Sequence, residues 1–478
     1  SGIALIPLSV KNAIFIFSLI GFGTKAGIIP FHIWLPVAHP SAPSHVSALM
    51  SGVMIKTGIY MIIRLSLDML QPIPLWWGLT ILIIGSVSTL LGVLHALTEH
   101  DIKKLLACHS IENIGIILLG IGSSMIFYSL NMPSLALLGL IAALFHTLNH
   151  AIFKSLLFLS AGSVINEMHT RNMEKYGGLI KYMPQTAIFF LIGSMAISAL
   201  PPFNGFFSEW LTFQTLFQGI MQFDPSLQWI FIIAAGSLTF TGGLALACFV
   251  KAFGSIFLAR PRSANITHVK ESSLSMRISM GVLALLSILF GIFSGYTTIL
   301  LEKIGKNFTI FQNTPSFIST NYYKNLSIGS NFASVSTPAL FILLIFAIFL
   351  VIFTFRYIIN KNQKIKINDT WNCGTQLTPR MEITATGFAR SIILIFKGIL
   401  KPSIQHEIEY HDAESRYLPK SRTITLSVGN MYHSYFYQPL HTIINGLSLR
   451  IKNIQSGNIN TYISYIFIAL IIALFTVL

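Results

Sequence analysis

Apolar runs close to 20 residues long, separated by short polar stretches, recur along almost the whole chain. A helix of about 20 apolar residues spans the hydrocarbon core of a bilayer, so each run predicts a transmembrane helix. The pattern predicts an all-α, polytopic transmembrane helical bundle with about eleven spans. These spans cover residues 10–29, 46–66, 77–97, 104–128, 133–164, 183–200, 204–222, 228–258, 277–300, 337–358 and 461–478.

Composition supports a membrane protein and narrows its chemistry. Hydrophobic residues make up 53% of the chain and charged residues only 10%, whereas about a quarter of the residues in soluble domains are charged. The net charge of +15 favours anionic lipid headgroups or an acidic partner over nucleic acid, because no solvated stretch is long enough for a nucleic-acid-binding domain. The three cysteines, Cys108, Cys248 and Cys373, lie far apart, which predicts no iron–sulfur cluster and no cofactor in this chain.

The first residue is Ser1, and an apolar segment follows almost at once without a charged leader. We therefore expect a missing N-terminal part rather than a signal peptide.

A broken helix is predicted at residues 21–65, GFGTKAGIIPFHIWLPVAHPSAPSHVSALMSGVMIKTGIYMIIRL. Its four prolines, from Pro30 to Pro43, prevent one continuous helix. Lys25 and Lys56 lie in the apolar parts on either side, where a lysine costs about 2.5–3.5 kcal/mol at the membrane centre. Lysine beside a broken helix is typical of transporters. We expect Lys25 to be buried at the break, where freed carbonyl groups stabilise its ammonium.

Three titratable residues recur at helical spacing in the span 133–164. His146, His150 and Lys154 stand at i, i+4 and i+8, so they share one helix face at steps of about 6 Å. One hypothesis is a proton relay. Two alternatives remain open: a zinc-binding histidine pair, which lacks a third ligand nearby in sequence, and packing histidines bonded across helices.

A second broken helix is predicted at residues 198–210, SALPPFNGFFSEW, with Glu209 just after the break. Like the first, it is an interrupted apolar segment with an ionisable residue beside the break. Two such segments indicate paired structural repeats, with the functional site where the two breaks meet. The alternative role for Glu209 is an interfacial carboxylate favoured by the helix dipole.

The segment between these features adds candidates near residue 100. His109 and Glu112 are three residues apart, close enough to pair on a helix. Lys103 is a further candidate, although basic residues at a helix end usually meet headgroups.

Polarity rises sharply at residues 361–460, which include Trp371-Asn372-Cys373-Gly374 and an acidic patch, His406–Glu414. We expect a core at 1–260, additional transmembrane helices at 261–360, a docking segment for soluble subunits at 361–460 and a last transmembrane helix at 461–478. The run Thr384–Lys401 could instead lie flat on the membrane or on a neighbouring subunit.

In these residues the sequence resembles the antiporter-like membrane subunits shared by respiratory complex I, Mrp-type cation/proton antiporters and membrane-bound hydrogenases. The resemblance covers residues 10–260 and runs in the family's order. Its motifs are PFHIWLPVAHPSAPS after Lys25, SGVMIKTGIY, HDIKKLLACHS, FHTLNHAIFKSLLFLSAGSVI and LPPFNGFFSEW. CHSIENIG and the tail WNCGTQLTPRMEITATGFAR are most similar to the branch of hydrogenase 4 component B and the large membrane subunit of formate hydrogenlyase.

The resemblance implies inverted repeats and residue roles in ion movement. Lys25 matches the family's central broken-helix lysine, Lys56 the lysine of the following helix, His146 and His150 its bridging helix, and Glu209 its terminal site. The family also pairs its first lysine with an upstream glutamate, a region that this sequence does not contain.

The resemblance further implies translocation of protons or sodium ions, coupled to electron transfer in partner subunits. The expected partners are lipid, other membrane subunits and a soluble [NiFe] hydrogenase or iron–sulfur arm, in the bacterial inner membrane. The alternatives are a non-pumping anchor of such a complex, a complex I or Mrp antiporter subunit, and a subunit for inorganic-carbon uptake. Buried lysines favour transport, because a pure anchor would gain stability with leucine at those positions.

Overall fold

The computed structural model describes most of the chain as two units, Ser1–Ile393 and Leu394–Leu478. The described residues are 6–258, 260–263, 266, 268–315, 318–321, 325–328, 333–359, 371, 373–375, 377–411, 419–429, 432–452, 455 and 457–477. Of the polar stretch predicted to dock partners, residues 361–370, 372, 376, 412–418, 430–431, 453–454 and 456 lie outside this set, and they include residues 412–414 of the acidic patch.

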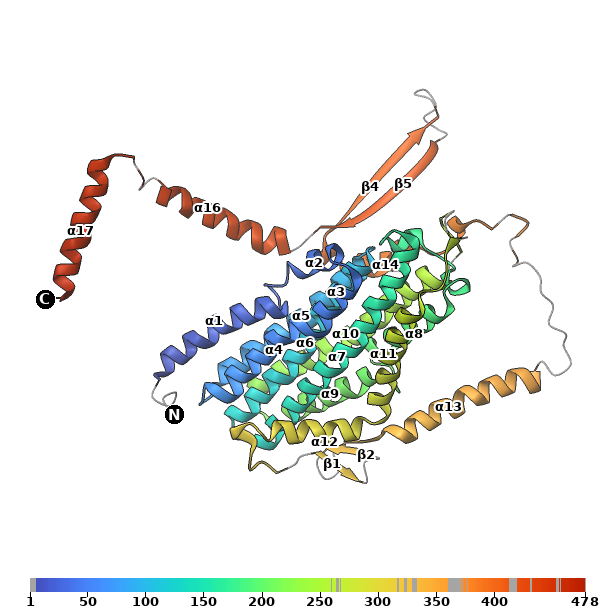
Figure 1. The fold of residues 1–478 in the computed structure, drawn as a ribbon, viewed down its shortest axis with the longest axis horizontal. Coiled ribbons are helices and arrows are strands. Elements are labelled where there is room, and N and C mark those ends of the chain that lie inside the picture. The colour runs from blue at the N-terminus through green and yellow to red at the C-terminus, as the bar shows by residue number, and fades with distance from the viewer. Residues whose placement is uncertain are drawn as a thin grey trace. The chain divides into compact units, whose positions relative to one another are not determined.

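The first unit is a helical bundle with one small sheet (Figure 1). Its long helices up to residue 305 are α1 (Leu8–Ala26), α4 (Ile55–Ile63), α5 (Leu75–Thr98), α6 (Ile102–Ser129), α7 (Pro133–Met168), α8 (Pro184–Ile197), α9 (Asn204–Gln222), α10 (Pro225–Phe253), α11 (Leu274–Ile292) and α12 (Ser294–Gly305). Shorter pieces connect them: α2 (Leu35–Ser41), α3 (Ser44–Leu49), the π-helical turns Met50–Met54, Arg64–Met69 and Gly254–Leu258, and the 3-10 turns Met173–Lys175, Leu179–Lys181 and Thr309–Phe311. An antiparallel sheet of β1 (Ile318–Asn321), β2 (Asn325–Ile328) and β3 (Ala333–Ser336) precedes α13 (Thr337–Phe353), the π-helical turn Thr354–Ile359 and the 3-10 turn Pro379–Met381.

The second unit begins within α14 (Ala385–Ile395). It contains α15 (Lys397–Leu400), an antiparallel hairpin and two helices. The hairpin pairs β4 (Pro402–Tyr410) with β5 (Pro419–Val428), with Pro402 opposite Val428. The π-helical turn His433–Tyr437 leads into α16 (Gln438–Lys452), and α17 (Ile459–Val477) follows.

Among the described residues, eight helices are long and apolar enough to cross a membrane. They span Ser44–Met69, Leu75–Thr98, Ile102–Ser129, Pro133–Met168, Pro225–Leu258, Leu274–Ile292, Thr337–Tyr357 and Ile459–Thr476. With α1, α8 and α9, which fall on three further predicted spans, they confirm the predicted all-α, multi-pass membrane fold. The core lies along α6, which is buried over nearly its whole length with α2, α5, α7, α9 and α10 packed around it.

Both predicted breaks are present. α1 ends at Ala26, where Gly27 takes a left-handed φ of 78°, and the chain resumes as α2 and α3. α8 ends at Ile197 and α9 begins at Asn204. The 14 residues of α8 are too few to cross the hydrocarbon core alone, as expected for half of a discontinuous helix.

One expectation about a segment requires correction. The single span predicted at 277–300 is wrong, because the helix divides at Phe293 into α11 and α12, with the weak helix formers Gly291 and Gly295 on either side. The flat orientation considered for Thr384–Lys401, on the membrane or on a neighbouring subunit, stays a prediction. Residues up to 393 bury a stripe of Ala385, Ala389 and Ile393 within their own unit, since these residues recur every fourth position.

Polar contacts from two glutamates hold this part of the tail. Glu174 accepts hydrogen bonds from the backbone N–H and the hydroxyl of Thr386, at 2.6 and 2.7 Å. Glu382 pairs with Arg260, with 3.2 Å between Nε and Oε1. The predicted domain boundaries at 260, 360 and 460 stay predictions, as do the inverted repeats.

Candidate functional site

The titratable residues of α7 form the centre of the candidate site. His146, His150 and Lys154 are all 0% exposed. The rings of His146 and His150 stack with 6.5 Å between centroids, which confirms the shared face that the spacing predicts. Neither ring nitrogen of His150 has a hydrogen-bond partner among the described residues.

Hydrogen bonds tie His146 to two neighbouring helices. Its Nε2 lies 3.2 Å from Oδ1 of Asn113 on α6, and its Nδ1 lies 3.0 Å from the hydroxyl of Ser208 on α9. The amide nitrogen of Asn113 donates to the carbonyl of His109 at 2.7 Å, so its oxygen faces the imidazole as an acceptor. A neutral His146 with its proton on Nε2 satisfies both contacts. Its partner Ser208 directly precedes Glu209, which is 6% exposed on α9.

The predicted pair on α6 is present and entirely internal. His109 Nδ1 contacts Glu112 Oε2, and the two residues are 0% and 1% exposed. The His109 ring also packs on Phe249 of α10, with 4.7 Å between centroids. A histidine paired with a carboxylate lowers the free-energy cost of placing either group in the membrane.

Two buried lysines, one on α7 and one on α4, donate hydrogen bonds to backbone carbonyls near α6. Lys154 donates to the carbonyl oxygen of Leu106 at 2.7 Å. Lys56, which is 8% exposed, donates to the carbonyl of Ser51 in the π-helical turn Met50–Met54. The Ser51 hydroxyl lies 2.8 Å from that of Ser110 on α6. Lys56 and Lys154 interact electrostatically with each other, and Lys154 also interacts with Glu112.

These groups form one buried set, which we call the polar row: Lys56, Lys154, His150, His146, Glu209, His109 and Glu112. Six of its seven members are at most 6% exposed. The row joins the helix after the first break to the helix after the second break, through α6 and α7. Charge on one member is felt by the next, because the low-dielectric interior screens such interactions poorly.

Lys25 lies elsewhere, which corrects one expectation. It is exposed on α1, whereas we expected it to be buried at the break. The buried face of α1 carries Phe15, Leu19, Gly23 and Ala26, which place Lys25 roughly a quarter-turn or more away around the helix. The prediction that Lys25 takes part in ion movement stays a prediction.

Lys103 is more deeply placed than a lysine that meets headgroups. It is 4% exposed and donates to the carbonyl of Ala42 at 2.7 Å, where α2 ends. Its neighbour Asp101 caps α6 and pairs with Arg171, with 3.2 Å between Oδ2 and Nε. Lys103 therefore links the first break to the N-terminal end of α6 by a hydrogen bond.

Sequence reasoning missed several buried polar residues. His39 is 0% exposed and stacks on Phe158 with 4.8 Å between centroids. Asn149 and Asn204 bond each other across α7 and α9, and Ser287 of α11 donates to Asn204 at 2.8 Å. The signal for all of them is a polar residue inside a predicted span or break. Lys11 and Lys251 carry the same signal and are 3% and 2% exposed.

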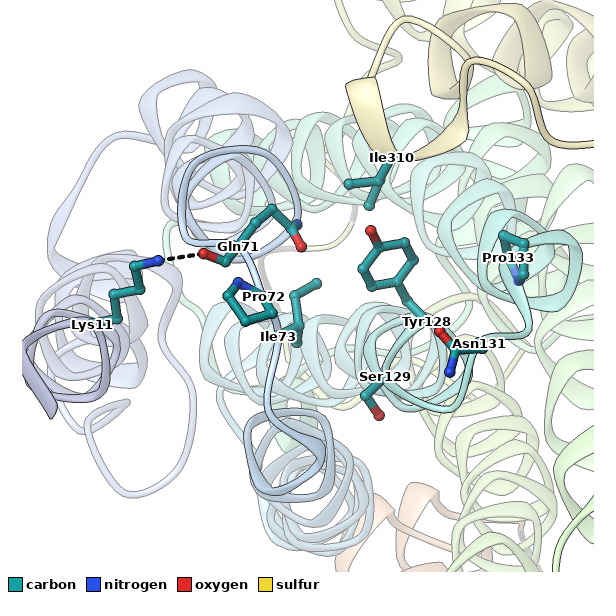
Figure 2. Close-up of a pocket in the computed structure, with 9 residues that line it drawn as sticks. All are labelled: Lys11, Gln71, Pro72, Ile73, Tyr128, Ser129, Asn131, Pro133 and Ile310. Atoms are coloured by element: carbon teal, nitrogen blue, oxygen red, sulfur yellow. Dashed lines mark hydrogen bonds between the residues drawn. The ribbon is translucent and has the colours of Figure 1, made fainter. Parts of the chain in front are cut away.

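A separate pocket of about 720 Å³ surrounds Lys11 (Figure 2). Gln71, Tyr128 and Asn131 line it with Lys11, which donates to the backbone carbonyl of Gln71. None of the predicted site residues lines this pocket. Among the described residues, no three His, Cys, Asp or Glu side chains gather closely enough to hold a metal ion.

Fold and site together define a class: multi-pass membrane proteins in which buried titratable side chains follow broken helices. Residues 6–242 match the family model described as NADH:quinone oxidoreductase/Mrp antiporter, TM. The chain is 38% identical over 472 residues to hydrogenase-4 component B of Escherichia coli (strain K12), covering 98% of this chain and 69% of that relative. The chain belongs to this family of antiporter-like membrane subunits, as the resemblance predicts.

Other relatives and solved structures agree. Formate hydrogenlyase subunit 3 of Escherichia coli (strain K12) is 36% identical over 397 residues, which cover 82% of this chain and 62% of that relative. A chain of the membrane-bound sulfane sulfur reductase, an archaeal respiratory membrane complex, matches with a TM-score of 0.72 and 24% identity, covering 98% of this chain and 69% of its own. A chain of respiratory complex I from Thermus thermophilus matches with a TM-score of 0.53 and 24% identity, covering 64% of this chain and 60% of its own. These two structures support the fold, and the two relatives are named as a component or a subunit of a larger assembly.

Proposed function

We propose that this chain is the proton-translocating membrane subunit of a redox-driven complex of the membrane-bound [NiFe] hydrogenase or formate hydrogenlyase type. The observation that supports it best is the polar row, which runs from Lys56 through Lys154, His150 and His146 to Glu209. Each member is titratable and buried, and the spacing along α7 is about one helical turn. Sodium is the alternative ion.

The row offers a physical route for coupling. A proton that reaches one member changes the electrostatic energy of the next, because lysine and carboxylate charges in the interior act on each other directly. Moving one charge against the membrane potential costs about 2.3 kcal/mol per 100 mV, and one unit of pKa change corresponds to about 1.4 kcal/mol. A pKa change of a few units in the row, driven by electron transfer, therefore matches the cost of moving one charge.

A non-pumping anchor is the second candidate. An anchor needs only the fold, and apolar residues would hold α6 and α7 together at lower free-energy cost than His109, Glu112 and Lys154. The proposed partners are the other membrane subunits and a soluble arm that carries the redox centres. Lys25 and Lys103 are proposed as further members of the path at the first break.

The test is proton translocation by the whole complex in sealed vesicles, measured with a pH-sensitive dye while electron transfer is followed separately. The proposal expects proton movement that stops when electron transfer is inhibited and when an uncoupler is added. Electron transfer at full rate without any proton movement would instead support the anchor.

Replacing His150 with alanine is expected to lower proton translocation while leaving the complex assembled. The relay needs a titratable group at each step of about 6 Å, and neither ring nitrogen of His150 bonds a described residue that assembly would lose. Translocation per electron and the yield of intact complex are the two measurements. His150→Phe fills the space and serves as the comparison. If the phenylalanine variant pumps normally, His150 is a packing residue.

The purified chain alone is expected to carry no stoichiometric iron, nickel or flavin. Its three cysteines are too few and too far apart for a cluster. Metal analysis and an absorption spectrum of the chain, freed from its partners, check this. One iron or flavin per chain would contradict this prediction, because it would show that this subunit holds a redox centre.

A further inference from the structure

Lys251 of α10 is a buried cation that the proposed path does not use. It is 2% exposed, and its ammonium donates to the carbonyls of Leu97 and Glu99, at 2.6 and 3.1 Å. These carbonyls lie where α5 ends. An ammonium has three N–H groups, so two bonds leave one donor without a partner among the described residues.

A group of titratable side chains leads from Lys251 toward the surface. Lys251 interacts electrostatically with Glu99, Glu174 and His100. His100 and Glu174 have side chains that are 32% and 25% exposed, with 3.8 Å between Nδ1 and Oε1. The Glu99 side chain has no hydrogen bond or ion pair to any described residue. Lys251 thus lies at the buried end of a cluster that opens to water.

Two buried thiols interact with both Lys251 and a member of the polar row. Cys248 precedes it by one turn on α10, and Cys108 lies on α6; both thiols are buried. These two thiols interact electrostatically with Lys251 and also with Lys154. Lys251 and Lys154 therefore share the Cys108 and Cys248 thiols as electrostatic neighbours.

We propose that Lys251, with Glu99, His100 and Glu174, is the water-side terminal of the proton path, where Lys154 exchanges protons with the aqueous phase. The proposal rests on the proposed function and adds a terminal that neither the motifs nor the polar row contains. Glu99 is the acceptor that contacts water, and Lys251 passes the proton between Glu99 and Lys154.

The protonation behaviour of the two outer groups is consistent with this role. Burial raises the pKa of the Glu99 carboxyl, with Asp101 acting in the same direction and Lys104 and Lys251 opposing it. Burial and the Lys251 charge lower the pKa of the His100 imidazole, while Glu174 opposes this change. Both shifts favour the neutral form of each group, and the raised pKa of Glu99 makes its carboxyl easier to protonate near neutral pH.

A purely structural role for Lys251 predicts a different outcome, which makes the proposal testable. As a cap of α5, Lys251 would be replaced well by arginine, which keeps the charge and the donors. If Lys251 is a relay, arginine cannot replace it, because a guanidinium holds its proton up to above pH 12. Lys251→Arg in the intact complex is expected to assemble normally and to lower protons translocated per electron to about a tenth or less.

Lys11→Arg is the matched control. Lys11 is also buried and also donates to a backbone carbonyl, in the pocket of Figure 2, but it belongs to neither the polar row nor the Lys251 cluster. This variant is expected to pump as the native complex does.

Glu99→Gln keeps the inference testable if Lys251→Arg does not fold. Among the described residues, the Glu99 side chain has no hydrogen bond or ion pair that folding would lose, so Glu99→Gln is expected to lower pumping with assembly intact. Normal pumping by Lys251→Arg or by Glu99→Gln overturns the inference. Lys154→Met distinguishes failure of this inference from failure of the proposed function. If Lys154→Met also pumps normally, the proposed function fails. If Lys154→Met stops pumping while Lys251→Arg and Glu99→Gln pump normally, only the assignment of the terminal is wrong.

Discussion

Replacing Lys154 with methionine is expected to abolish proton translocation while the complex still assembles. Lys154 is 0% exposed, shares a face of α7 with His146 and His150, and interacts electrostatically with Glu112. Methionine has a similar length, suits an apolar interior and cannot carry a proton. We expect translocation per electron to fall to about one hundredth of the native value or less.

The loss of translocation is checked by measuring proton uptake into vesicles with a pH-sensitive dye. The electron-transfer rate is measured in the same sample. Lys154→Arg should be nearly as damaging, since arginine does not release its proton. Lys175→Met, a change at an exposed lysine, is the control and should pump normally. Native pumping by Lys154→Met would show that the polar row is not the path.

Replacing Gly291 with alanine is expected to prevent stable packing of the second break. A Cβ at this position of α11 would lie 2.1 Å from the carbonyl oxygen of Pro202 and 2.9 Å from the carbonyl carbon of Phe203. Both are backbone atoms of the second break, so the clash cannot be relieved by a change of side-chain rotamer. Overpacking of this kind costs about 3 kcal/mol or more, and we expect little intact complex to accumulate.

Gly281→Ala on the same helix is the matched control. A Cβ there meets only the Phe189 ring, at 3.6 Å or more, an ordinary contact. Yield of intact complex and its temperature of thermal inactivation are the measurements. If Gly291→Ala matches Gly281→Ala in both, α11 does not hold the break in the way that the structure shows.

Much of this fold follows from local chemistry that can be read along the chain. The length of each apolar run predicts a crossing helix, and prolines at 30–43 and at Pro201-Pro202 predict the two breaks, because proline removes a donor and clashes with the preceding turn. The shared face of His146, His150 and Lys154 follows from helix geometry alone. The pairing of His109 with Glu112 follows from the same rule.

Local chemistry does not decide which face of a helix finds a neighbour. Lys25 has the sequence context of a buried lysine and is exposed, because α1 turns its Phe15, Leu19, Gly23 and Ala26 face inward. Lys251 has no motif around it, and its partners at Leu97 and Glu99 lie 154 and 152 positions away. Distant partners of this kind exist only once α5 and α10 are packed together.

The sequence by itself therefore determined the class of protein, the helices, their breaks and the titratable groups on α6 and α7. These depend on hydropathy, proline and helix periodicity, which act within a few residues. Only the tertiary structure decided which groups meet: His146 with Asn113 and Ser208, Lys154 with Leu106, and Lys251 with the end of α5. The physical reason is that buried hydrogen bonds between helices depend on how whole helices pack, which no local pattern encodes.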